Sequence, residues 1–227
     1  LPLCLMGYFL LNHFKMQKTA LLFLFGMSIW FYGYFNINYL WIILLSIGMN
    51  YLCYRGIYRC KGPKIRKTIM LAGVIMNVGI LFYFKYFDFF LENINMALKT
   101  DFALRNLLLP LGISFFTFQQ ISFIVDAYKK EVPEYSLLNY ACFVTFFPQL
   151  IAGPIVSHHE LVPQFKDVSK KKIQWENMAG GIYLFVLGMG KKVLLADSLG
   201  NAVNYGFLVG EGLNGTDTVL VMLAYTM

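Results

Sequence analysis

Long apolar runs separated by short polar connectors constrain this chain more than any other feature. Residues 19–35 and 37–54 are two such runs, joined only by the turn around Asn36 and Asn38. A membrane-spanning helix needs about 20 consecutive apolar residues. Of 227 residues, 58% are hydrophobic and 14% charged, whereas soluble domains have about 45–50% and about 25%. We therefore expect an all-α fold, a polytopic transmembrane helix bundle in a lipid bilayer, with residues 1–227 forming a single transmembrane domain.

Basic residues concentrate in one loop, residues 55–67, which contains six cations and no acid: Arg55, Arg59, Lys61, Lys64, Arg66 and Lys67. The formal net charge of the chain is +7. Cytoplasmic loops of membrane proteins collect Lys and Arg, most strongly in short loops beside membrane spans. We therefore expect loop 55–67, and both ends of the helical hairpin over residues 19–54, to lie in the cytoplasm. This reading explains the charge without a nucleic-acid partner, and we expect none.

Both ends of the chain have the character of interior sequence. Leu1–Leu11 is an apolar run of 11 residues, and another apolar run begins at Thr218 and continues to Met227. Each is shorter than the about 20 residues of a membrane span. We therefore expect the chain to be part of a longer protein, with its first helix cut and further sequence after Met227.

A third apolar run, Leu137–Val156, is long enough to cross a membrane but is interrupted. Pro148 and Pro154 break its second half, and Gly153 weakens it further. The pattern predicts a proline-broken or re-entrant segment, and we leave open which of the two it is. Irregular backbone at membrane depth persists only where it is buried in protein or lines a wet cavity. Neighbouring helices or a polar cavity beside Gln149 would satisfy it.

A narrow polar stripe crosses the apolar segment Leu107–Tyr128. On a helix, Gln119, Ser122 and Asp126 fall within about 60° of one another, and Gln120 points away from them. Such a stripe must face protein or water. It would either form hydrogen bonds between helices or line a polar cavity, and Asp126 can also reach the cytoplasmic interface.

The three histidines are the natural candidates for acid–base chemistry. His13 lies beside Lys15 in a short loop and is best explained as a solvated residue at the membrane interface. His158 and His159 are adjacent, so they lack the i, i+4 spacing of a helical metal site, and no cysteine is near them. We expect no metal site. The sequence also lacks a Gly-x-Ser-x-Gly nucleophile motif and a phosphate-binding loop.

The chain contains two long distinctive motifs, Pro110–Tyr128 and Phe146–Pro154, the second with a continuation at Glu160–Phe165. Both resemble the membrane-bound O-acyltransferase (MBOAT) family, in its bacterial branch around alginate O-acetyltransferase. Weaker similarities lie at Tyr83–Tyr86 and Lys191–Asp197. The similarities follow the family order along essentially the whole chain, which makes the resemblance specific.

The resemblance implies a multi-pass enzyme of the bacterial cytoplasmic (inner) membrane. Such an enzyme moves an acyl group, usually acetyl, from a cytoplasmic thioester donor to a hydroxyl of an extracytoplasmic polysaccharide such as alginate. The donor would be acetyl-CoA or an acyl carrier, used as a co-substrate, with no bound cofactor. The polysaccharide acceptor and other envelope acetylation proteins would be the partners.

The same resemblance bears on the site residues. Catalytic histidines of the family lie in a Trp-His context that residues 1–227 do not contain, so we expect them beyond Met227 and expect residues 1–227 to be inactive alone. No catalytic residue is carried over to His13, His158 or His159. The family's tunnel gives a role to the stripe and the broken segment, and the tunnel candidates are Gln119, Ser122, Asp126, Pro148, Gln149, Gly153 and Pro154.

Other functions remain open at this level. D-alanyl transfer to teichoic acid is the nearest activity within the same family. A transporter or channel is the competing class, because broken helices with polar residues also mark substrate paths there. A purely structural membrane subunit is a third reading. The motifs and the lack of a visible internal repeat favour the enzyme, while the acceptor and the oligomeric state stay undetermined.

Overall fold

The computed structural model describes residues 1–150, 153, 156–209 and 212–226. These residues form helices and connecting segments, and no strand occurs among them. The expected all-α class is therefore confirmed. The chain divides into two compact units, Leu1–Lys172 and Ile173–Met227. Our expectation of a single transmembrane domain over the complete chain stays a prediction.

Unit 1 begins with two helices and a tight reversal. Helices α1 (Pro2–His13) and α2 (Gln17–Phe35) pack together, and a short 3₁₀ turn, Ile37–Tyr39, leads into α3 (Leu40–Arg59). The Asn36 side chain holds this turn by accepting a hydrogen bond from the Asn38 backbone N–H at 3.0 Å. The predicted helix–turn–helix over residues 19–54 is confirmed, although its two helices pack little on each other: α2 packs on α1 and α7, and α3 packs on α4 and α6.

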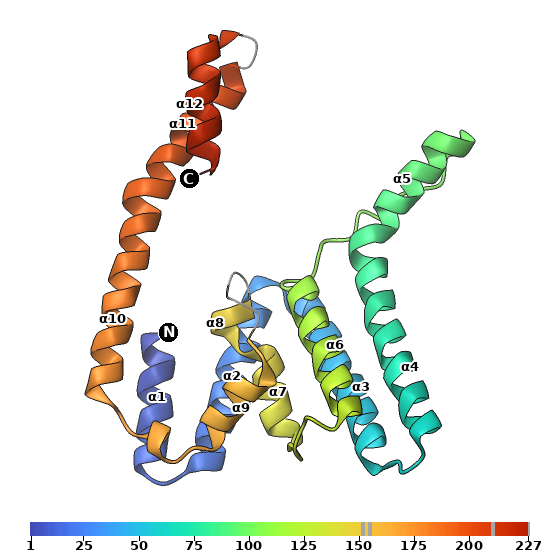
Figure 1. Ribbon diagram of the computed structural model, residues 1–227, viewed down its shortest axis with the longest axis vertical. Coiled ribbons are helices and arrows are strands. Elements are labelled where there is room, and N and C mark those ends of the chain that lie inside the picture. Colours follow the sequence, from blue (N-terminus) through green and yellow to red (C-terminus); the bar gives the residue numbers. More distant parts are fainter. Residues whose placement is uncertain (151–152, 154–155, 210–211, 227) are drawn as a thin grey trace. The chain divides into compact units, whose positions relative to one another are not determined.

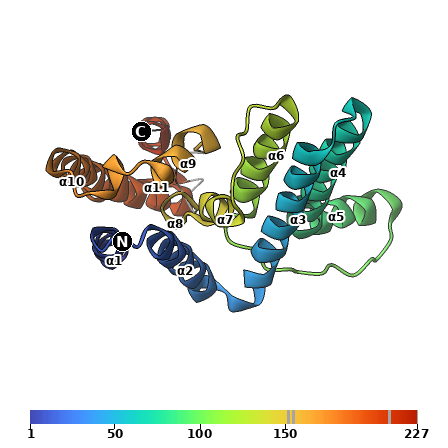
Figure 2. The same ribbon diagram turned by 90° about the horizontal axis from the view of Figure 1, so that it is seen from below.

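The predicted loop 55–67 is mostly helical: its first five residues end α3, its last five begin the next helix, and only residues 60–62 connect the two. The prediction of a loop of this length was wrong because both helices continue into the basic segment. Helix α4 (Pro63–Leu81) continues through a π-helical stretch, Phe82–Tyr86, into α5 (Phe87–Leu98). Pro63 suits the first turn of α4 because its missing N–H would have had no helical partner. Figures 1 and 2 both show α3 and α4 beside α6 (Ile113–Lys129), and these three helices pack pairwise.

Helix α6 begins later than the sequence predicts. Residues 107–112 are not helical, because Pro110 cannot donate a backbone hydrogen bond and Gly112 adopts a left-handed conformation with φ 64°. From Ile113 onward the predicted helix is confirmed. Phe116, Phe123 and Ile124 on α6 are almost fully buried, and the core of unit 1 forms around them.

The predicted interruption of the third apolar run is confirmed. Helix α7 (Leu137–Thr145) ends at Phe146, whose ψ of 99° leaves the helical region, and the single turn α8 (Phe147–Leu150) follows. Pro154 lies outside the described residues. Helix α9 (His158–Lys166) and a 3₁₀ turn, Ser169–Lys171, complete unit 1.

Unit 2 consists of a long helix and a shorter return. Helix α10 (Trp175–Gly190) continues through a π-helical stretch, Lys191–Ala196, into α11 (Asp197–Val209), and α12 (Gly215–Thr226) packs back on α11. A Cβ at Gly206 would lie 2.4 Å from Val221 Cγ2, so the glycine permits this close approach.

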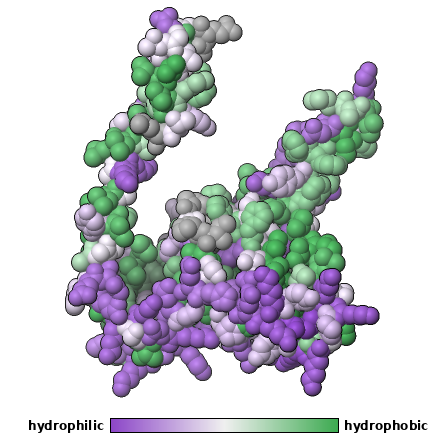
Figure 3. Space-filling view, viewed as in Figure 1, coloured by the Kyte–Doolittle hydropathy of each residue, from purple (hydrophilic) through white to green (hydrophobic). Residues whose placement is uncertain are grey.

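The membrane character of the chain is visible in both composition and surface. Among the described residues, three helices are long and apolar enough to cross a membrane: Ile37–Arg59, Pro63–Leu98 and Trp175–Val209. In unit 1, hydrophilic residues gather along the edge where α3 meets α4 and where α6 ends, with apolar surface beyond that edge (Figure 3). This segregation is typical of a protein with one end in water and its helices in lipid.

Candidate functional site

A small cavity lies against α6 on the side of the predicted polar stripe. Its volume is about 170 Å³, enough for several water molecules, and Gln119, Ser122 and His158 give it polar walls. The remaining lining residues are Phe123, Phe143, Val156 and Ser157. We call this cavity the α6 pocket. It joins a helix, the end of α7 and the start of α9, which are far apart in the sequence.

The three stripe residues share this side of α6. Gln119 and Ser122 line the α6 pocket, and the Ser122 hydroxyl lies 3.5 Å from Asp126 Oδ2, one turn further along the helix. The Gln119 side chain donates to the Phe143 carbonyl at 3.4 Å. Gln120 points away, as expected, and bonds instead to Ser46 and Tyr140 in the core.

His158 is a functional candidate to which the sequence analysis gave neither a metal-binding nor a catalytic role. Its side chain is 2% exposed, and its Nε2 lies 3.3 Å from Asp126 Oδ2. The Tyr135 hydroxyl is 3.4 Å from the other ring nitrogen, Nδ1. Burial, followed by the charge of His159, lowers the pKa of His158 below its ordinary value, although Asp126 opposes the shift. Burial therefore favours the neutral form of this imidazole.

The cap of α9 places His159 against His158. Ser157 begins the helix by accepting a hydrogen bond from the His159 backbone N–H at 3.3 Å. The two imidazole rings then lie with centroids 3.8 Å apart, His158 buried and His159 exposed. Asp126, His158 and His159 each present a possible ligand atom, and these atoms lie within 4.8 Å of one another.

The broken segment meets the stripe at one carbonyl group. Gln149 Nε2 donates to the Phe143 carbonyl at 3.0 Å, the same oxygen that Gln119 approaches. This oxygen needs side-chain donors because the helix breaks at Phe146 before the backbone can supply a partner. Gln149 Oε1 is buried and has no hydrogen-bond partner among the described residues.

Among the residues that the structure describes, the tunnel candidates Gly153 and Pro148 are not part of this hydrogen-bonded arrangement. A Cβ at Gly153 would lie 2.5 Å from Gln149 Cα, so only glycine fits there. Pro148 sits in the single turn of α8 and is not among the described residues that line the α6 pocket. The structure therefore brings Gln119, Ser122 and Asp126 together and links them to Gln149 through Phe143.

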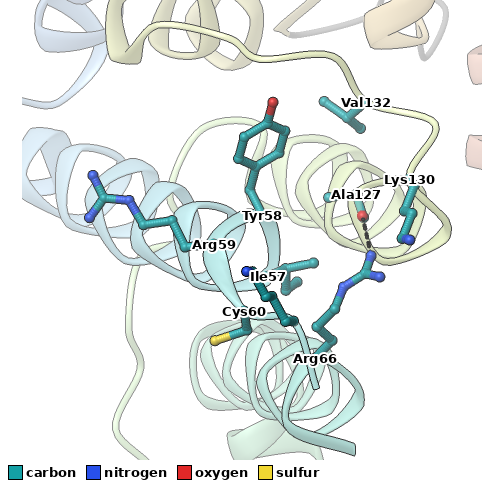
Figure 4. Close-up of a pocket in the computed structure, with 9 residues that line it drawn as sticks. Ile57, Tyr58, Arg59, Cys60, Arg66, Ala127, Lys130 and Val132 are labelled. Carbon is teal, nitrogen blue, oxygen red and sulfur yellow. Dashed lines mark hydrogen bonds between the residues drawn. The ribbon is translucent and has the colours of Figure 1, made fainter. Parts of the chain in front are cut away.

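A second cavity occupies the basic end of unit 1. Its volume is about 440 Å³, and its described lining includes four cations and no acid: Ile57, Tyr58, Arg59, Cys60, Lys61, Arg66, Ala127, Lys130 and Val132. Figure 4 shows the Arg66 guanidinium directed at the Ala127 carbonyl at the end of α6. Arg66 Nη2 lies 3.4 Å from that oxygen and donates at 2.6 Å to the Tyr128 carbonyl. This basic pocket has the charge to hold an anion such as a phosphate group.

Comparison with known proteins adds independent information. The family model described as MBOAT, membrane-bound O-acyltransferase family, matches residues 125–209, a stretch that includes Asp126, Gln149 and His158. No solved structure matches the chain.

Several curated proteins are similar in sequence. The peptidoglycan O-acetyltransferase of Helicobacter pylori is 37% identical over 252 residues, covering 100% of this chain and 48% of that protein. A probable alginate O-acetylase, AlgI, of Pseudomonas aeruginosa is 33% identical over 86% of this chain and 38% of its own length. The teichoic acid D-alanyltransferase of Bacillus subtilis is 27% identical over 75% of this chain and 39% of its own length. The chain thus spans about half the length, or less, of these relatives.

Proposed function

Because the chain belongs to the membrane-bound O-acyltransferase family, we propose that the complete protein is an O-acyltransferase of the bacterial inner membrane. It transfers an acetyl group from a cytoplasmic thioester donor to a hydroxyl of an extracytoplasmic polysaccharide. The observation that carries this proposal is the 37% identity, along the whole chain, to a protein named as a peptidoglycan O-acetyltransferase. Peptidoglycan and alginate are accordingly the two acceptors to test first.

The α6 pocket supports a passage through the protein. Polar side chains and a broken helix are costly in an apolar environment unless they are paired or line a hydrated space. Gln119 and Ser122 line a cavity, and Gln149 meets Gln119 at the Phe143 carbonyl. In our proposal these residues shape the route by which donor and acceptor approach each other, and the catalytic base comes from residues outside this chain.

The basic pocket supports an anionic donor. Acetyl-CoA carries several phosphate groups, and Arg59, Lys61, Arg66 and Lys130 line a cavity of about 440 Å³. A cytoplasmic position for these cations agrees with the positive-inside rule. In our proposal the donor therefore approaches from the side of loop 55–67, as a co-substrate.

Acetyl transfer by the full-length protein in isolated membranes tests the proposal. Membranes supplied with labelled acetyl-CoA should acetylate peptidoglycan or alginate. Gln149→Ala, which frees the Phe143 carbonyl, should lower the rate about tenfold, and Gly153→Leu should lower it about a hundredfold, since small displacements of reacting groups cost that much. Rates are compared at equal protein levels.

The matched control is Gln164→Ala. Gln164 is an exposed glutamine on α9 whose side chain donates, among the described residues, to the Glu160 carbonyl of its own helix, so its removal should leave the rate unchanged. Equal rates for Gln149→Ala and wild type would contradict the role given to the α6 pocket. Absence of acetyl transfer to any polysaccharide by the folded wild type would contradict the enzyme itself.

D-alanyl transfer is the second candidate within the family. The D-alanyltransferase of Bacillus subtilis supports it at a lower identity of 27%. Supplying a D-alanyl thioester and teichoic acid in the same assay separates the two activities, and transfer of D-alanine without acetyl would favour this alternative.

A further inference from the structure

Three side chains from two segments of unit 1 converge beside the α6 pocket. Asp126 comes from the end of α6, while His158 and His159 come from the start of α9. We propose that these three residues bind a divalent transition metal ion, with Zn²⁺ as the best fit. This departs from our sequence-based expectation of no metal, which considered only the spacing of two adjacent histidines. The third ligand comes from a different helix.

The separation of the ligand atoms fits a shared metal. With bonds of about 2.0–2.1 Å, two ligands of a tetrahedral zinc ion lie about 3.3–3.4 Å apart. His158 Nε2 and Asp126 Oδ2 are 3.3 Å apart. All three ligand atoms lie within 4.8 Å of one another, so the exposed His159 ring must move closer to complete the set.

The buried Nε2 of His158 makes no hydrogen bond of good geometry with the described part of the chain in this arrangement. Although Nε2 is close to Asp126, it has no partner of hydrogen-bond geometry among the described residues. Buried polar atoms are nearly always paired, so an unpaired one indicates a missing ligand, ion or water. A metal at this point would satisfy Nε2 and the Asp126 carboxylate together.

Contacts with neighbouring side chains fix the orientation of the His158 ring for metal binding. The Tyr135 hydroxyl lies 3.4 Å from Nδ1, which is the outer contact that orients most metal-binding histidines. Tyr135 is itself fixed, because its backbone N–H donates to the Tyr54 hydroxyl at 2.9 Å. The His158 and Phe123 rings make a T-shaped contact, with their planes at 86° and their centroids 5.3 Å apart, and this packing restricts rotation of the imidazole.

The donor set indicates which ion would bind. Two imidazole nitrogens and one carboxylate oxygen suit Zn²⁺, whereas Mg²⁺ and Ca²⁺ prefer oxygen ligands. Three protein ligands leave a fourth position, as in zinc sites that keep a water molecule. The α6 pocket, with Gln119 and Ser122 in its wall, has room for that water.

A plain hydrogen-bonded contact between α6 and α9 is the competing explanation. In that case His158 would carry a proton on Nε2 and donate it to Asp126. A metal site and a direct hydrogen bond predict different metal contents of the purified protein. Metal content is measured without an enzyme assay, so the test of the metal site is independent of the test of acyl transfer.

The test uses the full-length protein, purified in detergent, stripped with a chelator and then supplied with Zn²⁺ or Co²⁺. We expect one metal ion per chain and the visible absorption of tetrahedral Co²⁺. Asp126→Asn and His158→Gln should each weaken binding by at least about tenfold, and Tyr135→Phe by about 10- to 100-fold. His13→Gln is the matched control, because it removes the one histidine of the chain outside the cluster and should leave binding unchanged.

Because His158 is buried, His158→Gln can fail to fold, and His159→Gln therefore provides a second test of metal binding. His159 is exposed, so its replacement should leave the fold intact while weakening metal binding by about tenfold or more. Folding of each variant is checked by its thermal transition. A folded wild type that binds no metal would overturn the proposal, and so would unchanged binding in both Asp126→Asn and His159→Gln.

Discussion

At the scale of single residues, unit 1 contains buried polar side chains that pair completely. Asn50 on α3 and Asn77 on α4 are 0% and 1% exposed, and their amides bond reciprocally at 2.6 and 3.1 Å. Each also donates to a carbonyl of its own helix, at Ser46 and Gly73. The pair therefore joins two long apolar helices through a connected set of hydrogen bonds, and such sets are costly to break in part.

Removing one amide should show this coupling. We expect Asn77→Ala to lower the free energy of unfolding by about 1–2 kcal/mol, because the Asn50 side chain then lacks its buried partner. The double variant Asn50→Ala/Asn77→Ala should cost about 1 kcal/mol less than the sum of the single variants. Unfolding in mixed micelles measures all three.

Asn93→Ala is the control for this pair. Asn93 is exposed, and within the described part of the chain its side chain donates to the Phe89 carbonyl of its own helix, so its loss should cost less than about 0.5 kcal/mol. Strictly additive costs at Asn50 and Asn77 would show that the two amides act independently.

At the scale of elements, α4 packs against both of its neighbours through one glycine. A Cβ at Gly73 would lie 2.9 Å from Ile124 Cδ1 on α6 and 3.6 Å from Cys53 Sγ on α3. Small residues allow such close approach between membrane helices, where van der Waals packing is a principal source of stability. Gly73 is therefore the position on which the arrangement of these three helices depends most directly.

Two glycines of α4 provide a matched comparison. Gly73→Leu should lower the free energy of unfolding by about 1–3 kcal/mol, because the larger side chain forces α4 away from Ile124. Gly79→Leu should be neutral or slightly stabilising, since no described atom lies within 4 Å of a Cβ there. Thermal unfolding of the purified protein compares them, and equal effects at both positions would refute this account.

At the scale of the whole molecule, charge separates the two ends of unit 1. The cations of loop 55–67 gather at the end where α3 and α4 meet, and Arg55 forms an ion pair with Glu134 at 2.8 Å. The turn between α2 and α3 lies at the opposite end of α3. If the basic end is cytoplasmic, this turn lies on the outer side of the membrane.

Cys60 offers a natural probe of that orientation. It lies in the basic connector and is partly exposed. Cys53 is also partly exposed but lies within the apolar helix α3 beside Gly73, and Cys4 and Cys142 are buried. A membrane-impermeant maleimide should label Cys60 in inside-out vesicles and not in intact spheroplasts. Asn38→Cys, in a Cys60→Ser background, should give the reverse pattern. Labelling of Cys60 from the outside would contradict the positive-inside assignment.

By itself, the sequence determined the properties that depend on local composition. Long apolar runs predicted membrane helices, and Pro148 predicted the interruption of the run Leu137–Val156. The spacing of Gln119, Ser122 and Asp126 predicted that they share one side of α6. The sequence predicted helix ends less accurately than helix positions: α6 begins at Ile113 and not at Leu107, because Gly112 adopts a left-handed conformation. These features follow from backbone hydrogen bonding and periodicity, which neighbouring residues control.

Only the tertiary structure decided which distant residues meet. Helix α9 packs on α7, and this places the buried His158 beside Asp126 at the end of α6. The break after α7 brings Gln149 to the carbonyl that Gln119 approaches. Nothing in the spacing of His158 and His159 reveals an acidic partner on another helix. The reason is physical: the burial and partners of a polar side chain depend on how whole segments pack, and that packing reflects the sum of many weak contacts along the chain.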